Sequence, residues 1–542
     1  MKSIYKIVFT AAAISLLTFT GCKKFRDIND NPNNPEQVTI QLILPAAQAN
    51  IAQALGGKFQ IIGGLWSQYW TQNPSSSQYR VFEQYQISGS DINNAWNGLY
   101  AGALMDLQKV IDSAGSQKNY SAIAKILQGY TFHLLTDQFG DIPFSEALKG
   151  ESQDITSPKY ESQEAVYNGI IALVKEGMAE INEGAHPASD DLIYHGDMAL
   201  WQKFGNTLLL KVYMRLSERS PSVAQQGIAE LYANGLGFIE EGETALMTYS
   251  SEAGNYNPLY SEMDNSVIGR IQNLVASATA VDSFNSNGDI RVAIFYAPGG
   301  GGYVGLKQGD YGSSTPGTSV ARPSAAVGGD ASDLQSAVAP VVFISDYESL
   351  LLQAEAVVRG WATGDDKTLY ERAISANFEA YASTFATLQQ EGVLPTLVVD
   401  SVATSDTTGN PFFINYSIEY VVSVYLSGDS ALINAGDYYL GGEPVVSTPS
   451  SFWGKYPVAG SATQKLEFII TQKWFCMCGN QNIESWTEWR RTGFPSFFVY
   501  SPNSRIGNNF PVRFPYPDDE VSNNLNFPGQ KQVTDKVWWD VN

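Results

Sequence analysis

Side chains that could catalyse a reaction are few in this chain, and none has a known catalytic spacing. The three histidines, His133, His186 and His195, form no H-E-x-x-H pattern, which would place two of them on one helix face to bind zinc. The G-x-S-x-G turn that exposes a nucleophilic serine is also absent. We therefore predict no catalytic residue, no metal site and no cofactor. Glycoside hydrolysis stays open as an alternative, because it depends on the distance between two carboxylates rather than on a motif.

Two further stretches match ligand-binding motifs only in part. Residues 300–305 satisfy G-x-G-x-x-G, but no acidic residue stands in the right place and polar turn residues follow in place of a helix. We interpret them as a flexible loop. Residues 27–31 resemble the first half of a calcium loop, but its glycine and its closing glutamate are missing.

Aromatic side chains with polar edges are the best candidates for binding a ligand. Tyr and Trp present a flat apolar face and a polar tip, which suits stacking against sugar rings or peptide side chains. One group lies within residues 66–100 and another within the glycine-rich stretch 256–311. The candidate ligand-binding residues are Trp66, Tyr69, Trp70, Tyr79, Arg80, Tyr85, Trp96, Tyr296 and Tyr303.

Core packing is the alternative for each of these rings. Trp66 and Trp70 are four residues apart and would lie on one face of a helix. A ring in the glycine-rich stretch could simply cover its own loop. If Tyr79 and Tyr85 bind ligand, replacing both by Ala should weaken binding without lowering the melting temperature.

The first residues resemble a bacterial lipoprotein signal. Lys2 and Lys6 precede an apolar segment that ends in small residues before Cys22. In such signals the cysteine receives a diacylglycerol, and its acyl chains hold the protein on the membrane. We expect a signal peptide at 1–21, a lipid-anchored linker at 22–40 and a ligand-binding domain at 41–542. The alternative is an ordinary cleaved signal with an incidental cysteine.

Helices with an apolar stripe must position these side chains. Ile123, Leu127, Tyr130 and Leu134 share a helix face, and Phe139-Gly140 ends the pattern. Similar stripes follow at 157–181, 200–212, 345–360, 367–385, 411–426 and 463–491. The pairing of these segments predicts an all-α fold of tetratricopeptide-like helical hairpins, with long loop-rich insertions such as 284–340.

Composition narrows the possible partners. The chain has 542 residues, of which 44% are hydrophobic, so it can bury one large core or two moderate ones. Its formal net charge of -22 would repel phosphate backbones, and we expect no nucleic acid partner. No stretch after residue 22 offers about 18 consecutive uncharged apolar residues, which a bilayer-spanning helix would need.

Several segments, taken in order, resemble the SusD/RagB family of outer-membrane nutrient-binding lipoproteins, in particular its SusD-like branch. They are LLTDQFGDIPFSEA at 134–147, PKYESQEAVYNGI from Pro158, LWQKFGNTLLLKVYMRL at 200–216, SDYESLLLQAEAVVRGW at 345–361, IITQKWFCMCGNQNIESWTEWRRTGFP at 469–495 and PVRFPYPDDE from Pro511. Because these motif residues fall on helix faces and helix ends, we interpret them as residues that maintain the fold.

The resemblance implies a function and a partner. Such proteins bind oligosaccharides or peptides outside the cell and deliver them to a SusC-like TonB-dependent transporter in the outer membrane. For this chain it implies a non-enzymatic, lipid-anchored protein at the cell surface, with a glycan as the first expectation. An oligopeptide ligand, a membrane-anchored glycoside hydrolase and a structural adhesin are the alternatives. Lys23 and Lys24 replace an acidic run after Cys22, so an inward-facing tether also stays open.

Overall fold

A computed structural model describes residues 39–184, 190–264, 267–391 and 452–542, together with short elements between 397 and 444. Cys22, the predicted signal peptide and residues 27–31 lie outside the described residues. Within the described part of the chain, no helix is both long and apolar enough to cross a bilayer.

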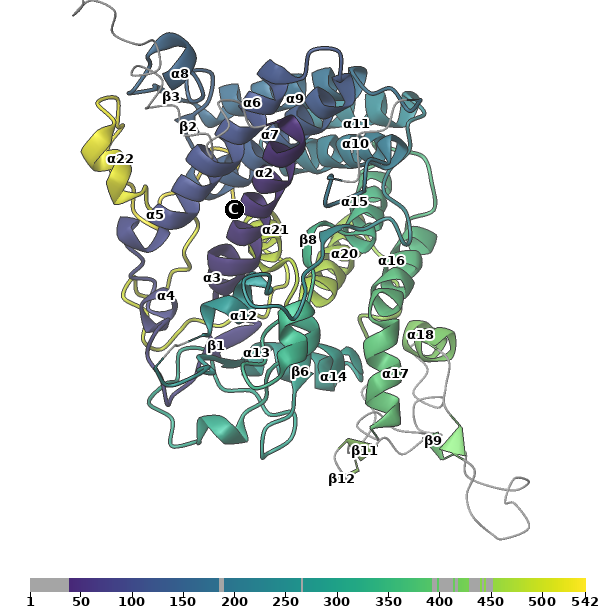
Figure 1. Cartoon of the computed structure of the whole chain (residues 1–542). Coiled ribbons are helices and arrows are strands. Elements are labelled where there is room, and N and C mark those ends of the chain that lie inside the picture. Colours follow the sequence, from purple (N-terminus) through teal and green to yellow (C-terminus); the bar gives the residue numbers. More distant parts are fainter. Residues whose placement is uncertain are drawn as a thin grey trace, which may run out of the picture.

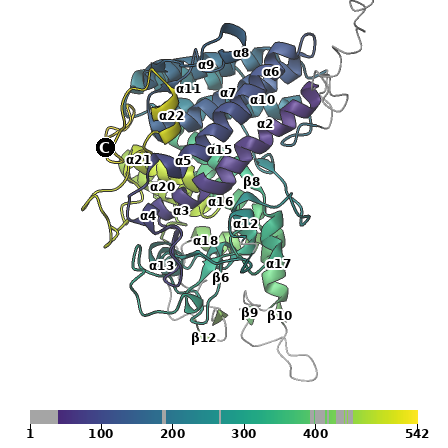
Figure 2. The same ribbon diagram turned by 60° about the vertical axis from the view of Figure 1, so that its left-hand side comes forward.

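Five helices form one end of the molecule, at the top of Figures 1 and 2. They are α6 (Met105–Ser113), α7 (Lys118–Phe139), α9 (Gln163–Ala179), α10 (Met198–Arg215) and α11 (Pro221–Ala233). Each packs on the next in the order α6, α7, α9, α10, α11. This stacking of sequential helices confirms the predicted all-α architecture of tetratricopeptide-like hairpins.

A second group of helices continues from this end toward the centre. It contains α15 (Asp346–Val358), α16 (Asp366–Ala380), α20 (Ala462–Met477) and α21 (Asn482–Thr492), with the N-terminal α2 (Ile40–Ala54) and α3 (Gln60–Trp66) beside them. α15 packs on both α16 and α20, and α3 packs on α21. Helices from the early and late parts of the described chain therefore pack together in the middle of the fold.

Glycines and caps explain where the helices begin and end. α7 stops at Gly140, whose φ of 77° favours glycine. α10 begins after Asp197, whose carboxylate accepts the backbone N–H groups of Ala199 and Leu200. The segment 463–491, which the sequence pattern joins, is two helices separated at Gly479, where φ is 77°. The 367–385 pattern likewise divides at Tyr381 into α16 and α17 (Ala382–Gln390).

The loop-rich end lies opposite, at the bottom of both views. It contains antiparallel two-stranded sheets: β1 (Trp70–Gln72) with β5 (Leu274–Ala276), and β6 (Tyr296–Ala297) with β7 (Arg322–Pro323). A further antiparallel pair, β4 (Ala245–Met247) with β8 (Val341–Ile344), lies nearer the centre, where Figure 1 labels β8 beside α15 and α20. The stretch 284–340, expected to be loop, includes the end of α13 (Ala278–Ser286) and also α14 (Arg291–Phe295). These short elements hold the loops against the helical core.

The remaining elements are short, except for α18. They are η3 (Leu55–Phe59), α4 (Arg80–Glu83), α5 (Gly89–Asn97), η4 (Gly98–Leu104), β2 (Ile142–Pro143), α8 (Gly150–Gln153), β3 (Tyr160–Glu161), α12 (Pro258–Glu262), η5 (Gly317–Ser319), η6 (Ala325–Val327), η7 (Leu334–Val338), β9 (Leu397–Val398), β10 (Phe413–Ile414), α18 (Ile418–Ser427), β11 (Tyr439–Leu440), β12 (Glu443–Pro444) and α22 (Asp518–Asn523). Within the predicted helix 411–426, Phe413–Ile414 form the strand β10 instead, and the helix α18 begins at Ile418.

Candidate ligand-binding site

The rings predicted as ligand contacts between residues 66 and 100 are buried in the core. Each exposes 4% of its surface or less: Trp66, Tyr69, Trp70, Tyr79, Tyr85 and Trp96. The Trp66 indole N–H donates to the Phe82 carbonyl at 2.9 Å, and Trp96 packs edge-on against Phe139 with ring centroids 4.8 Å apart. These rings present no face to solvent in this structure, and core packing, the alternative left open by the sequence, accounts for their positions.

Of the other three predicted residues, two lie closer to the surface and one is buried. Arg80 and Tyr303 are half-buried. Tyr296 is fully buried, and its hydroxyl donates to the Tyr69 carbonyl at 2.9 Å. The structure therefore leaves Arg80 and Tyr303 as the predicted residues that a ligand can reach.

A groove of about 790 Å³ lies between α14, α17 and the segment that contains η6 and η7. Tyr296 and Tyr303 both line it, so the structure brings together two residues that the sequence places on one glycine-rich stretch. A volume of this order is typical of small-ligand sites, which fall between about 300 and 1,000 Å³. Its size suits a short stretch of an extended oligomer.

Arg322 is fixed in the wall of this groove. Its Nε donates to the Asp330 carboxylate at 2.8 Å, and an Nη donates to the Pro298 carbonyl at 3.1 Å. Asp330 in turn accepts the Ser332 hydroxyl at 2.6 Å. The Arg322 side chain is 31% exposed, so a ligand can reach a donor whose position is already set.

Tyr303 and Tyr381 add rings to the lining of the groove. The Tyr303 hydroxyl is buried and has no hydrogen-bond partner within the described residues. Burial raises the pKa of Tyr303 to about 12, so the hydroxyl keeps its proton. The Tyr381 hydroxyl, by contrast, accepts the Asn480 amide at 2.8 Å.

The chemistry of this groove is that of binding. Rings, a guanidinium and amide or carboxylate oxygens, including those of Gln335 and Asp333, can stack on and hydrogen-bond a polar oligomer. Across the described ranges, no group of three His, Cys, Asp or Glu side chains is arranged to hold a metal ion.

Sequence reasoning missed Arg322, Asp330 and Tyr381 as groove residues. Arg322 and Asp330 lie in a stretch without periodicity, and Tyr381 lies at the break between two helices. Their only sequence signal was the length of the loop-rich segment, which is typical of binding surfaces. The contact between α17 and this segment is tertiary, and no spacing reveals it.

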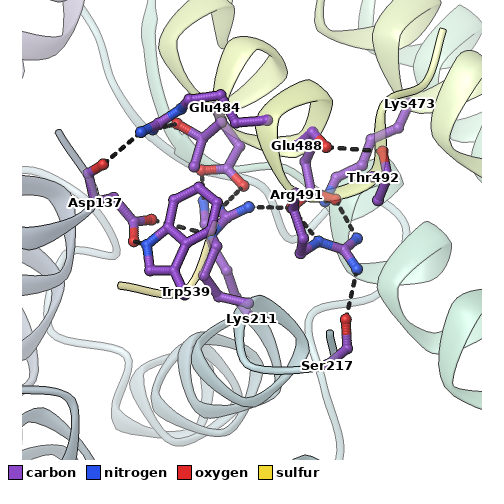
Figure 3. A network of polar contacts seen from close by, with 12 residues as sticks. Asp137, Lys211, Ser217, Lys473, Glu484, Glu488, Arg491, Thr492 and Trp539 are labelled. Atoms are coloured by element: carbon purple, nitrogen blue, oxygen red, sulfur yellow. Dashed lines mark hydrogen bonds and ion pairs between the residues drawn. The ribbon is translucent and has the colours of Figure 1, made fainter. Parts of the chain in front are cut away.

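A network of buried charges lies at the junction of α7, α10, α15, α20 and α21, apart from the groove (Figure 3). Arg215 contacts the Asp137 carboxylate at 3.1 Å, and Arg491 contacts that of Glu355 at 2.7 Å. All the network's side chains are buried: the cations are Lys211, Arg215, Lys473, Arg490 and Arg491, and the anions are Asp137, Glu348, Glu355, Glu484 and Glu488. Five positive and five negative charges thus balance inside the protein.

The network shifts the pKa values of its members without forming an open site. Burial alone would raise the pKa of Glu484, but the charges of Arg215, Lys211 and Lys473 outweigh it and lower that pKa to about 2. Burial lowers the pKa of His133 to about 4, and the positive charges of Arg215 and Lys211 add to this effect. The adjoining cavity has about 20 Å³, which is room for about one water molecule.

This network explains the motif segments found in the sequence. All ten charged residues lie in the segments 134–147, 200–216, 345–361 and 469–495. Those segments hold the helices of the scaffold to one another through ion pairs, as expected of residues that maintain a fold.

Comparisons with known proteins agree with this architecture. Residues 32–401 match the family model described as starch-binding and associating with the outer membrane, and residues 413–540 match the model described as SusD and RagB outer membrane lipoprotein. A search of curated proteins found no match.

Solved structures share the fold over nearly the whole chain. A chitin-binding protein is 23% identical with a TM-score of 0.63, and the alignment covers 92% of this chain and 100% of that one. A protein from Bacteroides vulgatus, titled as probably involved in nutrient binding, is 21% identical with a TM-score of 0.68, at 93% and 100% coverage. A chitin-binding SusD homologue from Flavobacterium johnsoniae is 21% identical with a TM-score of 0.68, at 93% and 99% coverage. With the first family model alone spanning more than half of the sequence, this chain belongs to the SusD/RagB family of outer-membrane proteins.

Proposed function

We propose that this protein captures extracellular oligosaccharides in the groove and delivers them to a SusC-like TonB-dependent transporter. The observation that carries the proposal is the groove itself, where the half-buried Tyr303 ring lies with the fixed guanidinium of Arg322. Rings stack on the apolar face of a sugar, and a fixed donor selects among its hydroxyls. The names of two similar structures, both chitin-binding, favour a glycan over a peptide.

Binding without turnover is the favoured mode. Asp330 in the groove is engaged by Arg322, which leaves it poorly suited to act as a general acid. A hydrolase would release new reducing ends from a glycan. Incubating the purified protein with oligosaccharides should therefore leave their length unchanged.

Calorimetric titration with chitin oligosaccharides and with starch oligosaccharides tests the binding role. We expect saturable binding of one of these glycans, and Tyr303→Ala should weaken it about tenfold, equivalent to about 1.4 kcal/mol. Tyr232→Ala is a matched control, because Tyr232 is also half-buried with a buried hydroxyl that has no partner among described residues, but it lies on α11. If both variants bind as tightly as the wild type, the groove is not the site. Binding of peptides alone would assign the groove to the alternative ligand class.

The anchor and the partner belong to the same proposal. Lipid on Cys22 would hold the protein to the outer membrane, facing outward, next to its transporter. Labelled fatty acid should appear on the wild-type protein in growing cells, and Cys22→Ala should release the protein from the membrane fraction. Protease added to intact cells should digest an outward-facing protein, whereas protection would indicate the inward-facing tether. Purification of the wild type from membranes should bring the SusC-like transporter with it.

A further inference from the structure

Three segments meet at a second surface, formed by α4, residues 309–311 and the loop 499–510. The Asn503 amide donates to the Gly309 carbonyl at 2.7 Å, and the Arg505 backbone N–H donates to the Gln84 carbonyl at 2.9 Å. The loop is also held at its start, where the Gln68 amide donates to the Val499 carbonyl at 2.7 Å. These bonds fix the positions of side chains that come from distant parts of the sequence. The groove described above is lined by other segments.

Arg80 stacks on Tyr311 at this surface, and Arg505 comes from the neighbouring loop. The Arg80 guanidinium carbon lies 5.0 Å from the centre of the Tyr311 ring. Burial raises the pKa of Tyr311, and the negative charge of Glu83 also raises it; contact with the Gln84 side chain and the positive charges of Arg80 and Arg505 lower it. Arg505 lies on the loop whose backbone N–H bonds Gln84 at the end of α4, so both arginines belong to the surface around Tyr311.

The hydrogen-bonding capacity of these two arginines is largely unused. Within the described residues, neither guanidinium forms an ion pair with an acidic side chain, although the chain carries 22 more acidic than basic residues. An Arg80 Nη donates to the Pro74 carbonyl at 3.2 Å, while its Nε is buried and has no hydrogen-bond partner among the residues that the structure describes. A buried donor without an acceptor costs free energy until an acceptor arrives.

The nearest acidic side chain, Glu83, is already hydrogen-bonded to other groups. Glu83 is buried, and its carboxylate accepts the Gln308 amide at 2.8 Å and the Gly309 backbone N–H at 3.3 Å. Asp310 precedes Tyr311 but forms no ion pair with Arg80 or Arg505 in the described part of the chain. Screening limits the effect of the protein's more distant negative charges to about 8 Å at physiological ionic strength. A local anion would therefore meet two cations here.

We propose that Arg80 and Arg505 form a subsite for the carboxylate of an acidic sugar unit, such as a uronic acid, next to Tyr311. Guanidinium groups bind carboxylates through two parallel N–H donors, and stacking on Tyr311 holds Arg80 in position before the ligand binds. The subsite rests on the proposed function, because it recognises one unit of the captured oligosaccharide. It narrows the ligand from glycans in general to glycans that carry carboxylates.

Titration of the full chain with a tetramer of galacturonic acid and with its neutral methyl ester tests this subsite. The two sugars share a backbone and differ in charge, so we expect the acid to bind about tenfold more tightly or better. Arg80→Gln and Arg505→Gln should each remove most of that preference and leave binding of the ester unchanged. Arg372→Gln is the matched control, because Arg372 is an exposed arginine that pairs with Glu241 on another part of the surface.

The outcomes separate this subsite from the proposed function. Equal binding of acid and ester, or an acid preference that survives both substitutions, overturns the subsite, while the groove is judged by Tyr303→Ala. If an acidic peptide depends on Arg80 and Arg505 and the uronic tetramer does not bind, the sugar assignment is wrong. If chitin and starch oligosaccharides and both tetramers all fail to bind, the proposed function fails as well. Circular dichroism spectra that match the wild type show that the variants fold.

Discussion

The Lys211 ammonium lies 2.9 Å from the Glu348 carboxylate and 3.0 Å from that of Glu484, and all three side chains are largely buried. Lys211 belongs to α10, whereas its partners belong to α15 and α21. This contact joins three helices through one cation. Breaking this contact should lower the stability of the fold, because a buried charge that loses its partner is destabilising.

Lys211→Met should lower the free energy of unfolding by about 3 to 5 kcal/mol, because two carboxylates lose a buried counter-ion. Urea unfolding monitored by circular dichroism measures the change. Lys159→Met is the control: Lys159 is 71% exposed and pairs with Glu146 at 3.3 Å, so its loss should cost less than about 1 kcal/mol. Equal losses in the two variants would contradict a structural role for the buried network.

His133 should make the fold sensitive to mild acid. Burial lowers its pKa from 6.5 to about 4, so the unfolded chain takes up a proton over a range in which the folded protein does not. The stability that His133 contributes is present above pH 6.5 and is lost as pH falls to about 4, by up to roughly 3 kcal/mol. His133→Gln should remove this part of the slope. Parallel pH profiles of the two proteins between pH 7.5 and 4.5 would show that His133 does not titrate in this way.

Glu83 should change the stability of the fold with pH in the opposite direction to His133. Burial raises its pKa from 4.5 to about 7 against its hydrogen bonds, so the folded protein keeps a proton that the unfolded chain releases. The resulting stability is full below pH 4.5 and is lost as pH rises through 7, again by up to roughly 3 kcal/mol.

Glu83→Gln keeps an oxygen acceptor for Gln308 and should remove the loss between pH 5 and 8, measured by urea unfolding. Glu379→Gln, at an exposed position on α16, should leave the slope as in the wild type. Glu83 and His133 change the free energy of unfolding in opposite directions as pH rises. Removing one of them should therefore leave the pH dependence due to the other without that opposing contribution. A Glu83→Gln profile that matches the wild type would assign Glu83 an ordinary pKa.

Tyr79 and Tyr85 should now behave as core residues, contrary to the expectation from sequence. Both are buried, and Tyr79 stacks on Phe82 with ring centroids 5.9 Å apart. Replacing either by Ala should lower the free energy of unfolding by about 3 kcal/mol or more, because the cavity is added to the loss of burial. Thermal melts of the single variants measure this, and unchanged melting temperatures would restore the original expectation.

The sequence alone determined the scaffold. Stripes such as Ile123, Leu127, Tyr130 and Leu134 predicted α7, because a helix buries every third or fourth residue and that spacing is visible in one dimension. Motif segments such as 345–361 and 469–495 also identified the family, which the family models then confirmed. The signal peptide and Cys22 stay predictions, because they lie outside the described residues.

Only the tertiary structure decided which aromatic side chains a ligand can reach. Trp66 and Tyr303 look alike in the sequence, since an amphipathic ring suits both a core and a binding surface. Burial separates them: Trp66 packs against Trp486 at 4.8 Å, while Tyr303 lines the groove. Whether a ring is covered depends on segments hundreds of residues away, and the spacing along the chain carries no record of those contacts.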